Sequence, residues 1–378
     1  MVEFSKLPPK LKSSILMHIS GLLLCLSVFS YMVFTFVSCR YNRLTYDVVP
    51  VDPYEAHFNT YLKSFGKQYQ VEEYRRRLNN FKRSSSEIER LNSYHDEPIF
   101  GWTKFSDMTP EEFDHKMLLP AGSMGGECKD VKLSCDHNKA NTVEEQKSKN
   151  IPIPDIFDWR DDKVVGPVLD QGMCLSCWAF SVVGVMESML VISNLTHSYQ
   201  RLSIQELVDC STYTSQCRAG NVVKVLKYLC NEPLAIIPEA QYPLTNKDED
   251  CKIHEKSYSG ISVSNMVSIC DMDAKEIARL VATHGPVVTV VQAYVWQNYL
   301  NGVIRFHCSG NWDLIKHVVQ IVGYDMTAEV PYFILRNSWG ADFGDKGYVK
   351  VAMDGFVCGV GRQISYFDVT KIKISDRK

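Results

Sequence analysis

Cys177 is the first residue of a long apolar stretch that follows a loop. This position could make its thiol reactive. The stretch CWAFSVVGVMESMLVI (177–192) follows Ser176, a residue type that often caps the start of a helix. Unpaired backbone N–H groups and the helix dipole favour a negative charge at such a start, so they would lower the pKa of the thiol. Because the thiolate is the nucleophilic form, we expect an activated cysteine. The alternative is a structural cysteine buried on an apolar helix.

The sequence Cys174-Leu175-Ser176-Cys177 also forms a C-x-x-C pair, which allows two other interpretations. A thioredoxin-like oxidoreductase uses such a pair at a helix start, but no β-α-β pattern brackets this one. A zinc site would need more ligands, and no second C-x-x-C or H-x-x-x-H lies at ligand spacing. We therefore expect neither a metal nor a cofactor.

Three stretches that follow one another along the chain carry the strongest functional signal. They are DQGMCLSCWAF (170–180), HVVQIVGYD (317–325) and RNSWG (336–340). These stretches resemble the three active-site blocks of the papain family of cysteine proteases, and the chain from 151 to 369 can be followed against that family's pattern. The resemblance implies a cysteine-type endopeptidase that is made as a precursor and hydrolyses protein and peptide substrates through an acyl-enzyme.

The resemblance also assigns a role to each catalytic residue. Cys177 would attack the scissile carbonyl, and His317 would form an ion pair with the thiolate and later protonate the leaving amine. Asn337 would orient the imidazole through a hydrogen bond, which Trp339 would shield. Gln171 would direct its amide at the developing oxyanion, alongside the backbone N–H of Cys177. Each residue taken singly also has an ordinary structural interpretation, and it is their joint occurrence in order that favours catalysis.

The substrate-binding residues follow from the same resemblance, which also shows where this chain departs from the family pattern. They are Leu175, Ser176, Ala219, Gly220, Trp339 and Gln363. Leu175 and Ala219 stand where relatives mostly have glycine, in the pocket for the substrate residue immediately before the cut. Gln363 would form the floor of the main specificity pocket. A second function therefore stays open, namely a papain-fold peptide-binding protein whose catalysis Leu175 and Ala219 weaken.

The chain has thirteen cysteines, an odd number that fits disulfide pairs plus a free thiol in an oxidising compartment. By resemblance, three disulfides would join Cys174 to Cys217, Cys210 to Cys251, and Cys308 to Cys358. Cys230 and Cys270 would then remain as an extra pair, and Cys128 and Cys135 could form a local bridge. Cys177 would keep the free thiol.

Residues 1–40 are predicted to target the chain. The stretch ILMHISGLLLCLSVFSYMVFTFVS (15–38) has 24 residues, more than the core of an ordinary cleaved signal and enough to span a bilayer. We expect a signal peptide or a signal-anchor, and we favour the anchor. Both lead into the secretory pathway, and the resemblance implies a lysosome or an equivalent acidic compartment. Asn194 begins an Asn-Leu-Thr glycosylation pattern.

Residues 53–118 are charged and are predicted to be helical. One set of residues recurs at helical spacing on a single face: Glu73, Arg77, Phe81, Ser84, Ile88 and Asn92. An ordinary amphipathic helix has the same spacing. These residues nevertheless resemble the helix motif of the family's inhibitory propeptides, and GWTKFSD (101–107) resembles a second motif. The resemblance implies a propeptide that covers the cleft until acid loosens it.

The rest of the chain divides in two. Residues 119–150 contain few large apolar groups and are predicted to be a linker and activation region. Residues 151–378 would form the mature peptidase domain. Helical patterns come first and strand patterns later, which predicts an α+β fold. The resemblance makes this the papain-like two-lobed fold, with a helical left lobe, an antiparallel barrel-like right lobe and a helical propeptide before them.

The bulk properties agree with this organisation. The 378 residues suffice for two domains, and the formal net charge of −3 gives no reason to expect nucleic acid as a partner. We expect a monomer whose partners are its substrates, its own propeptide and, through residues 15–38, a membrane.

Overall fold

The computed structural model describes residues 8–44, 52–135, 152–232, 234–253 and 257–374. The chain falls into two units, Met1–Thr60 and Tyr61–Lys378. Helix α1 (Pro9–Leu44) lies in the first unit, and helix α2 (Pro53–Ser64) crosses the boundary between the units.

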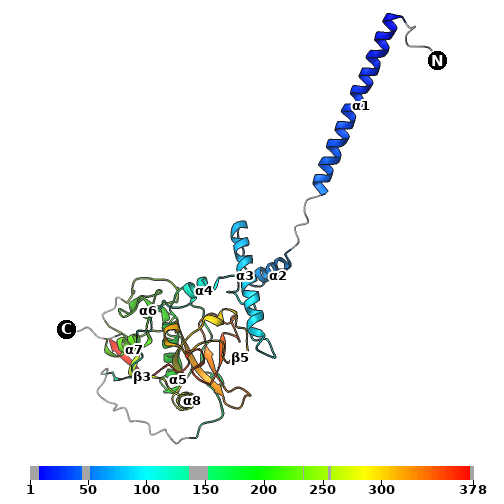
Figure 1. Ribbon diagram of the computed structural model, residues 1–378. Coiled ribbons are helices and arrows are strands. Elements are labelled where there is room, and N and C mark those ends of the chain that lie inside the picture. Colours follow the sequence, from blue (N-terminus) through cyan, green and yellow to red (C-terminus); the bar gives the residue numbers. More distant parts are fainter. Residues whose placement is uncertain (1–7, 45–51, 136–151, 233, 254–256, 375–378) are drawn as a thin grey trace. The chain divides into compact units, whose positions relative to one another are not determined.

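Helix α1, drawn in blue in Figure 1, exposes large apolar side chains between Leu11 and Val37, among them Leu22 and Phe29. From Pro9 to Val37 it is long and apolar enough to cross a membrane. A signal sequence near the N-terminus has the same properties. Both forms of the predicted targeting segment therefore remain compatible with this helix.

The predicted propeptide forms helices α3 (Val71–Asn92) and α4 (Pro110–Met117) in the second unit. The buried face of α3 includes Arg77, Phe81, Ser84 and Ile88, which agrees with the predicted helix face. Helix α4 begins after Thr109, whose side chain accepts a hydrogen bond from the backbone N–H of Glu112. Its first residue is Pro110, whose missing N–H costs nothing at that position.

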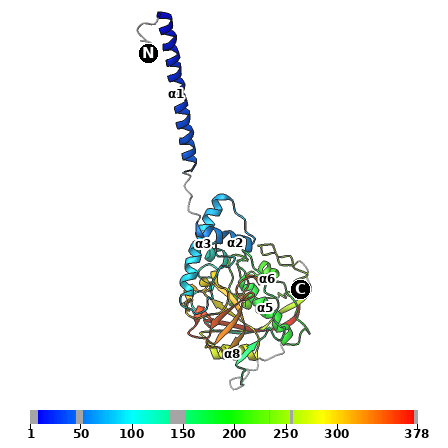
Figure 2. The same ribbon diagram turned by 90° about the vertical axis from the view of Figure 1, so that its right-hand side faces the viewer.

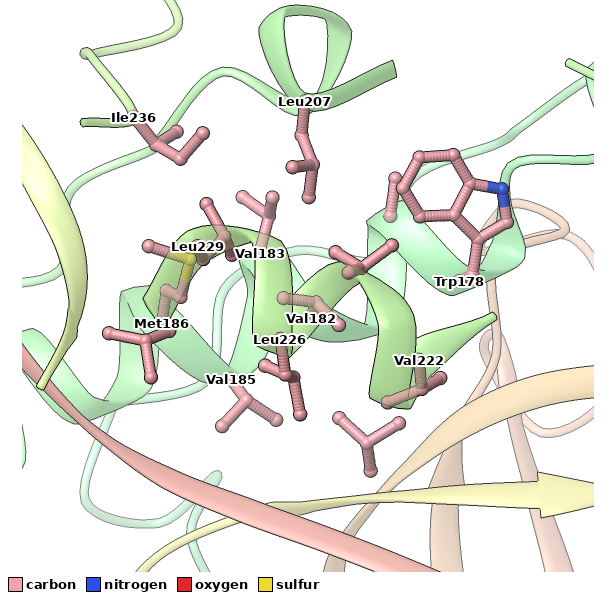
Figure 3. Packing of buried hydrophobic residues seen from close by; sticks show 14 of the residues in the cluster. Trp178, Val182, Val183, Val185, Met186, Leu207, Val222, Leu226, Leu229 and Ile236 are labelled. Atoms are coloured by element: carbon pink, nitrogen blue, oxygen red, sulfur yellow. The ribbon is translucent and has the colours of Figure 1, made fainter. Parts of the chain in front are cut away.

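Three helices form one side of the remaining domain: α5 (Cys177–Ile192), α6 (Ile204–Cys210) and α7 (Val222–Asn231). Helix α5 carries apolar residues around most of its circumference, which is typical of a helix buried on all sides. Figure 3 shows its side chains, among them Trp178 and Val182, gathered against Leu226 of α7 and Leu207 of α6.

The strands form one nine-stranded sheet with the order β1-β3-β9-β4-β6-β7-β8-β5, and β2 pairs with β6. The strand bounds are β1 (Val131–Ser134), β2 (Ile156–Asp158), β3 (Tyr258–Cys270), β4 (Val287–Val291), β5 (Val303–Ile304), β6 (His317–Asp325), β7 (Tyr332–Arg336), β8 (Tyr348–Ala352) and β9 (Gln363–Ile374). All pairings are antiparallel except that of β5 with β8. Helix α8 (Ala274–Thr283) packs against β6.

Helices α5 to α7 belong to one apolar cluster, and strands β5, β7 and β8 contribute to another; these clusters correspond to the two predicted lobes. Strands β4 and β6 lie between them and contribute side chains to both clusters. In Figures 1 and 2 the green helices α5 and α6 lie together beside the orange strands. The two lobes meet where α5 packs on β6. Gly184 allows this approach, since a Cβ there would lie 2.1 Å from the side-chain nitrogen of Gln320. The α+β, two-lobed prediction is confirmed.

Three of the predicted disulfides are present, Cys174–Cys217, Cys210–Cys251 and Cys308–Cys358. The predictions for the other four cysteines were wrong. Cys128 is bonded to Cys270, and Cys135 is bonded to Cys230, so neither a local bridge nor a Cys230–Cys270 pair forms. The reason is that β1 lies along β3, with its two ends near Cys270 and α7.

The predicted linker is ordered as far as the structure describes it. Residues 119–135 contain strand β1, and both Leu119 and Met124 are buried. Residues 136–150 lie outside the described part of the chain. Composition did not predict the ordered structure of residues 119–135, because their contacts come from a few apolar residues and from backbone hydrogen bonds.

Candidate active site

Cys177 is the first residue of α5 and is fully buried. Its sulfur is close to the backbone N–H groups of Val318, Trp178 and Cys177 itself, which favour the thiolate. Burial has the larger effect and raises the pKa of the thiol to about 12. The expected position at a helix start is therefore present, but in this covered form the thiol is neutral because it is excluded from water.

His317 is the first residue of β6, directly before Val318, and is also fully buried. Its Nε2 lies 2.8 Å from Oδ1 of Asn337, an acceptor that requires the proton on Nε2. In the neutral imidazole, Nδ1 is then an acceptor, and it has no hydrogen-bond partner among the described residues. Burial lowers the pKa of His317 to about 4, although the Asn337 bond opposes this.

The histidine and its asparagine are held in place by buried neighbours. The Asn337 Oδ1 also accepts a hydrogen bond from the backbone N–H of Ser338 at 2.9 Å, which fixes the orientation of the amide. The indole of Trp339 stacks on the imidazole of His317, with ring centroids 4.7 Å apart. Trp296 meets the same imidazole edge to face at 6.1 Å. Water is thereby kept from the histidine and its hydrogen bond.

Gln171 is buried in the loop before α5. Its Nε2 donates to the carbonyl of Cys174 at 2.9 Å, and its Oε1 accepts from the hydroxyl of Ser338 at 2.6 Å. These bonds tie the loop before Cys177 to the loop after Asn337. An amide held in this way lies between the two chain segments that carry the candidate nucleophile and the histidine's partner.

The Cys174–Cys217 disulfide joins the two loops that carry the predicted substrate-binding residues. Leu175 donates its backbone N–H to the carbonyl of Cys217 at 2.8 Å, and its side chain is partly buried. Gly220 has no room for a side chain, since a Cβ would lie 2.3 Å from the indole of Trp178. Ser176 is buried, whereas Ala219 is only partly so. The disulfide also leaves Cys177 without a C-x-x-C partner, which excludes the oxidoreductase interpretation.

Gln363, the predicted pocket floor, lies at the start of β9 opposite Cys270 of β3. It is buried, and its Oε1 has no hydrogen-bond partner among the described residues. An unpaired amide oxygen could accept one hydrogen bond from a ligand.

Residues 118–125, here called the cover segment, lie across this site. The backbone N–H of Leu119 donates to the carbonyl of Lys316, directly before His317, at 2.7 Å. Farther along, the side chain of Asn221 donates to the carbonyl of Met124 at 2.8 Å. Leu119 and Met124 belong to the same apolar cluster as Cys177. The cover segment thus runs from the histidine side of the site to the Gly220 side. Its composition, with few large apolar groups, does not indicate this route.

Two aromatic rings of the predicted propeptide also contact the site, at the indole of Trp339. Phe105 and Phe113 each meet Trp339 edge to face, with centroid distances of 5.6 and 5.4 Å. Near them, Lys104 forms an ion pair with Asp170 at 2.6 Å. On the cover side, Lys316 is paired with Asp114 of α4 at 2.8 Å, so its charge is neutralised in this form.

The propeptide region has a polar core of its own around Arg77. This guanidinium donates to both carboxylate oxygens of Glu112, at 2.7 and 2.8 Å, and to Glu73 at 2.7 Å. Burial would raise the pKa of Glu112, but the hydrogen bonds from Arg77 and Lys116 outweigh it and lower this pKa to about 2. Arg77 therefore joins α3 to α4, and Glu73 holds its guanidinium from within α3.

Comparisons with known proteins identify two families that the chain resembles. A family model described as papain family cysteine protease matches residues 153–367, and one described as cathepsin propeptide inhibitor domain matches residues 58–113. Cathepsin O of Mus musculus is 39% identical over 217 residues, which are 57% of this chain and 68% of that protein. Cathepsin O of Homo sapiens is 35% identical over 268 residues, 71% of this chain and 78% of that protein.

Solved structures show the same relationship at the level of the fold. A structure of digestive procathepsin L2 proteinase from Tenebrio molitor larval midgut has a TM-score of 0.68 and 27% identity, covering 83% of this chain and 99% of that one. The recombinant stem bromelain precursor has a TM-score of 0.68 at 24% identity, covering 84% of this chain and 99% of that one.

Proposed function

Because the chain belongs to the papain family of cysteine proteases, we propose that it is the zymogen of a cysteine-type endopeptidase with Cys177 as nucleophile and His317 as base. The observation that carries this proposal is the state of the imidazole. Its Nε2 is occupied by Asn337, while Nδ1 is buried without a partner among the described residues. An oriented imidazole with one free acceptor is what a thiol at the neighbouring helix start requires as its base.

The mechanism follows from these positions once a peptide replaces the cover segment. The thiol proton moves to Nδ1 of His317, and the sulfur attacks the scissile carbonyl carbon. The resulting oxyanion is stabilised by the backbone N–H of Cys177 and by the amide of Gln171. The imidazolium then gives its proton to the leaving amine, which leaves a thioester. Water, deprotonated by His317, hydrolyses the thioester and restores the thiol.

In this proposal the precursor is inactive for two reasons: the cover segment blocks access of substrate, and it excludes water from Cys177 and His317. The covered site holds a thiol with a raised pKa and an imidazole with a lowered pKa, both because of burial. Removal of the cover segment returns solvent to both groups, so the ion pair of thiolate and imidazolium becomes favourable again. We divide the chain into four functional regions. Residues 1–40 target it, residues 53–118 inhibit the enzyme, residues 119–150 form the activation region, and residues 151–378 form the peptidase.

The substrate preference proposed rests on Gln363 and Leu175. A neutral amide at the pocket floor cannot form an ion pair with an arginine, so a medium apolar residue two positions before the cut is preferred. The Leu175 and Ala219 side chains narrow the pocket immediately before the cut. Five disulfides in the described chain require an oxidising compartment, which supports the secretory pathway and, as a proposal, a lysosome or equivalent. Asn194 is exposed, as a glycosylated residue must be.

The test is to incubate the full chain in acid with a peptide library and map the cleavages, with Cys177→Ser as the inactive control. Cleavage by the parent alone, after medium apolar residues at the second position, supports the proposal. Peptide binding without any cleavage would instead support the alternative, a papain-fold binding protein with weakened catalysis.

A further inference from the structure

Residues Cys128–Cys135, here called the strap, follow the cover segment and are covalently bound to the peptidase domain at both ends. Cys128 is bonded to Cys270 at the end of β3, and Cys135 is bonded to Cys230 near the end of α7. Both partners lie far along the chain, at sequence separations of 142 and 95. The strap therefore closes two long loops across the boundary predicted between propeptide and enzyme.

Non-covalent contacts hold the strap as well. Its strand β1 pairs with β3 along its whole length, from Val131 opposite Ser268 to Ser134 opposite Asn265. The backbone N–H of Cys135 donates to the carbonyl of Ser264 at 2.9 Å. Val131 and Leu133 pack against the apolar cluster of the helical lobe. The strap is thus an edge strand of the peptidase sheet and shields β3 from pairing with other chains.

These bonds decide which cut can release the propeptide. Hydrolysis adds one water across a C–N bond and moves no electrons, so it leaves every disulfide intact. A cut after Cys135 would leave the helices, the cover segment and the strap attached to the enzyme through two disulfides. Only a cut before Cys128 separates α3, α4 and the cover segment from the peptidase domain without a reductant.

The residues just before Cys128 are suited to such a cut. Gly125, Gly126 and Glu127 are consecutive and exposed, whereas Met124 before them is buried. Gly125 has a φ of +89°, which only glycine adopts without strain. Exposed loop tips of small and polar residues are preferred sites of proteolytic nicking.

We propose that maturation cuts the chain within Gly125–Glu127 and that the active enzyme keeps the strap as a disulfide-bonded strand. This cut lies inside the activation region of 119–150, so residues 128–135 of that region stay bonded to the peptidase of 151–378. This inference rests on the proposed function in one respect only, namely that the cut enzyme with its bound strap is an active protease.

The covalent part is tested in full-length Cys177→Ser protein, which cannot process itself. One variant receives the recognition site of a sequence-specific protease between Gly126 and Glu127, and a matched variant receives it between Asn141 and Thr142. After digestion and blocking of free thiols, both are run on denaturing gels without and with reductant. The first should separate into two chains under both conditions, and the second only with reductant. Separation of the second variant without reductant would overturn the proposal.

The natural cut is tested in the parent protein. The full chain is matured in acid, labelled with a thiol-reactive peptide inhibitor and mapped by mass spectrometry without reduction. Labelled enzyme should contain the Cys128–Cys270 and Cys135–Cys230 cross-linked peptides and a new N-terminus at Gly126 or Glu127. Labelled enzyme that lacks residues 128–135 would overturn the proposal. Absence of labelling would count against the proposed function instead, while the Cys177→Ser variants still report on the strap.

Discussion

Phe113 of the propeptide packs edge to face on Trp339 of the peptidase domain, with ring centroids 5.4 Å apart and planes at 82°. Trp339 in turn stacks on the imidazole of His317. One indole therefore contacts the propeptide with one part of its surface and the candidate catalytic histidine with another. The propeptide completes the exclusion of water from the site, because Phe113 and Trp339 are themselves fully buried.

Replacement of Phe113 should loosen the propeptide. Phe113→Ala removes a fully buried ring, and such a change costs about 3–5 kcal/mol. Part of this loss falls on the contact with Trp339, so Cys177 in the full chain should react with a thiol-directed inhibitor much faster at neutral pH. The control is Val71→Ala, since Val71 is 71% exposed at the start of α3. Equal labelling rates for parent and Phe113→Ala would argue against this contact as a source of latency.

Acid release should depend on a histidine pair between propeptide and enzyme. Nε2 of His95 lies 2.9 Å from Nε2 of His307, and the rings stack at 4.6 Å. Burial, then the neighbouring His95, lowers the pKa of His307 to about 4, and burial with Arg305 lowers that of His95. Arg90 also disfavours charge here, while Asp96 favours it.

The lowered pKa values determine how docking of the propeptide depends on pH. The docked state lowers the pKa of both imidazoles and so disfavours their charged forms. In the released state they have ordinary pKa values near 6.5. Docking is therefore strongest above about pH 6.5 and weakens as the pH falls towards 4, since the released state binds more protons. His95→Gln should flatten the pH profile of inhibitor labelling in this window. An unchanged profile would exclude the pair. Glu112, with a pKa of about 2, stays ionised throughout and cannot provide the switch.

The Cys174–Cys217 disulfide should be structural. The double variant Cys174→Ser/Cys217→Ser, made in the Cys177→Ser background, should lose about 2–5 kcal/mol of unfolding free energy relative to that background. Denaturant unfolding measures this loss. No loss of stability would show that the two loops around Leu175 and Gly220 are held by other contacts.

The Leu175 side chain should restrict the residue immediately before the cut. Leu175→Gly should raise the rate on substrates with arginine or lysine at that position more than on substrates with glycine there. Equal gains on both sets would mean that Leu175 affects general competence and not pocket size. No change would mean that its side chain points away from the cleft.

The sequence was sufficient for the parts of the site whose residues are local or belong to the recognised blocks. Cys177 at a helix start and His317 at a strand start could both be placed, and so could the helix face around Arg77. The strap could not, because Cys128 and Cys135 are close in sequence and suggest a local bridge, while their true partners depend on β1 joining β3.

The pKa shifts of the site residues could not be predicted from the sequence either. The helix start at Cys177 correctly indicates groups that favour a thiolate, but the burial of the thiol outweighs them and raises its pKa. In the same way, His95 and His307 are 212 positions apart, and only the docked propeptide brings them together.

The most direct test is to treat acid-matured protein with a peptide epoxide that alkylates activated cysteines and to locate the label by mass spectrometry, with peptide cleavage measured in parallel. We predict one label, on Cys177, with loss of cleavage in proportion to labelling, and neither label nor cleavage in Cys177→Ser, whose hydroxyl is far harder to deprotonate. Cleavage that persists at the parent's level in Cys177→Ser would contradict the assignment of Cys177 as the nucleophile.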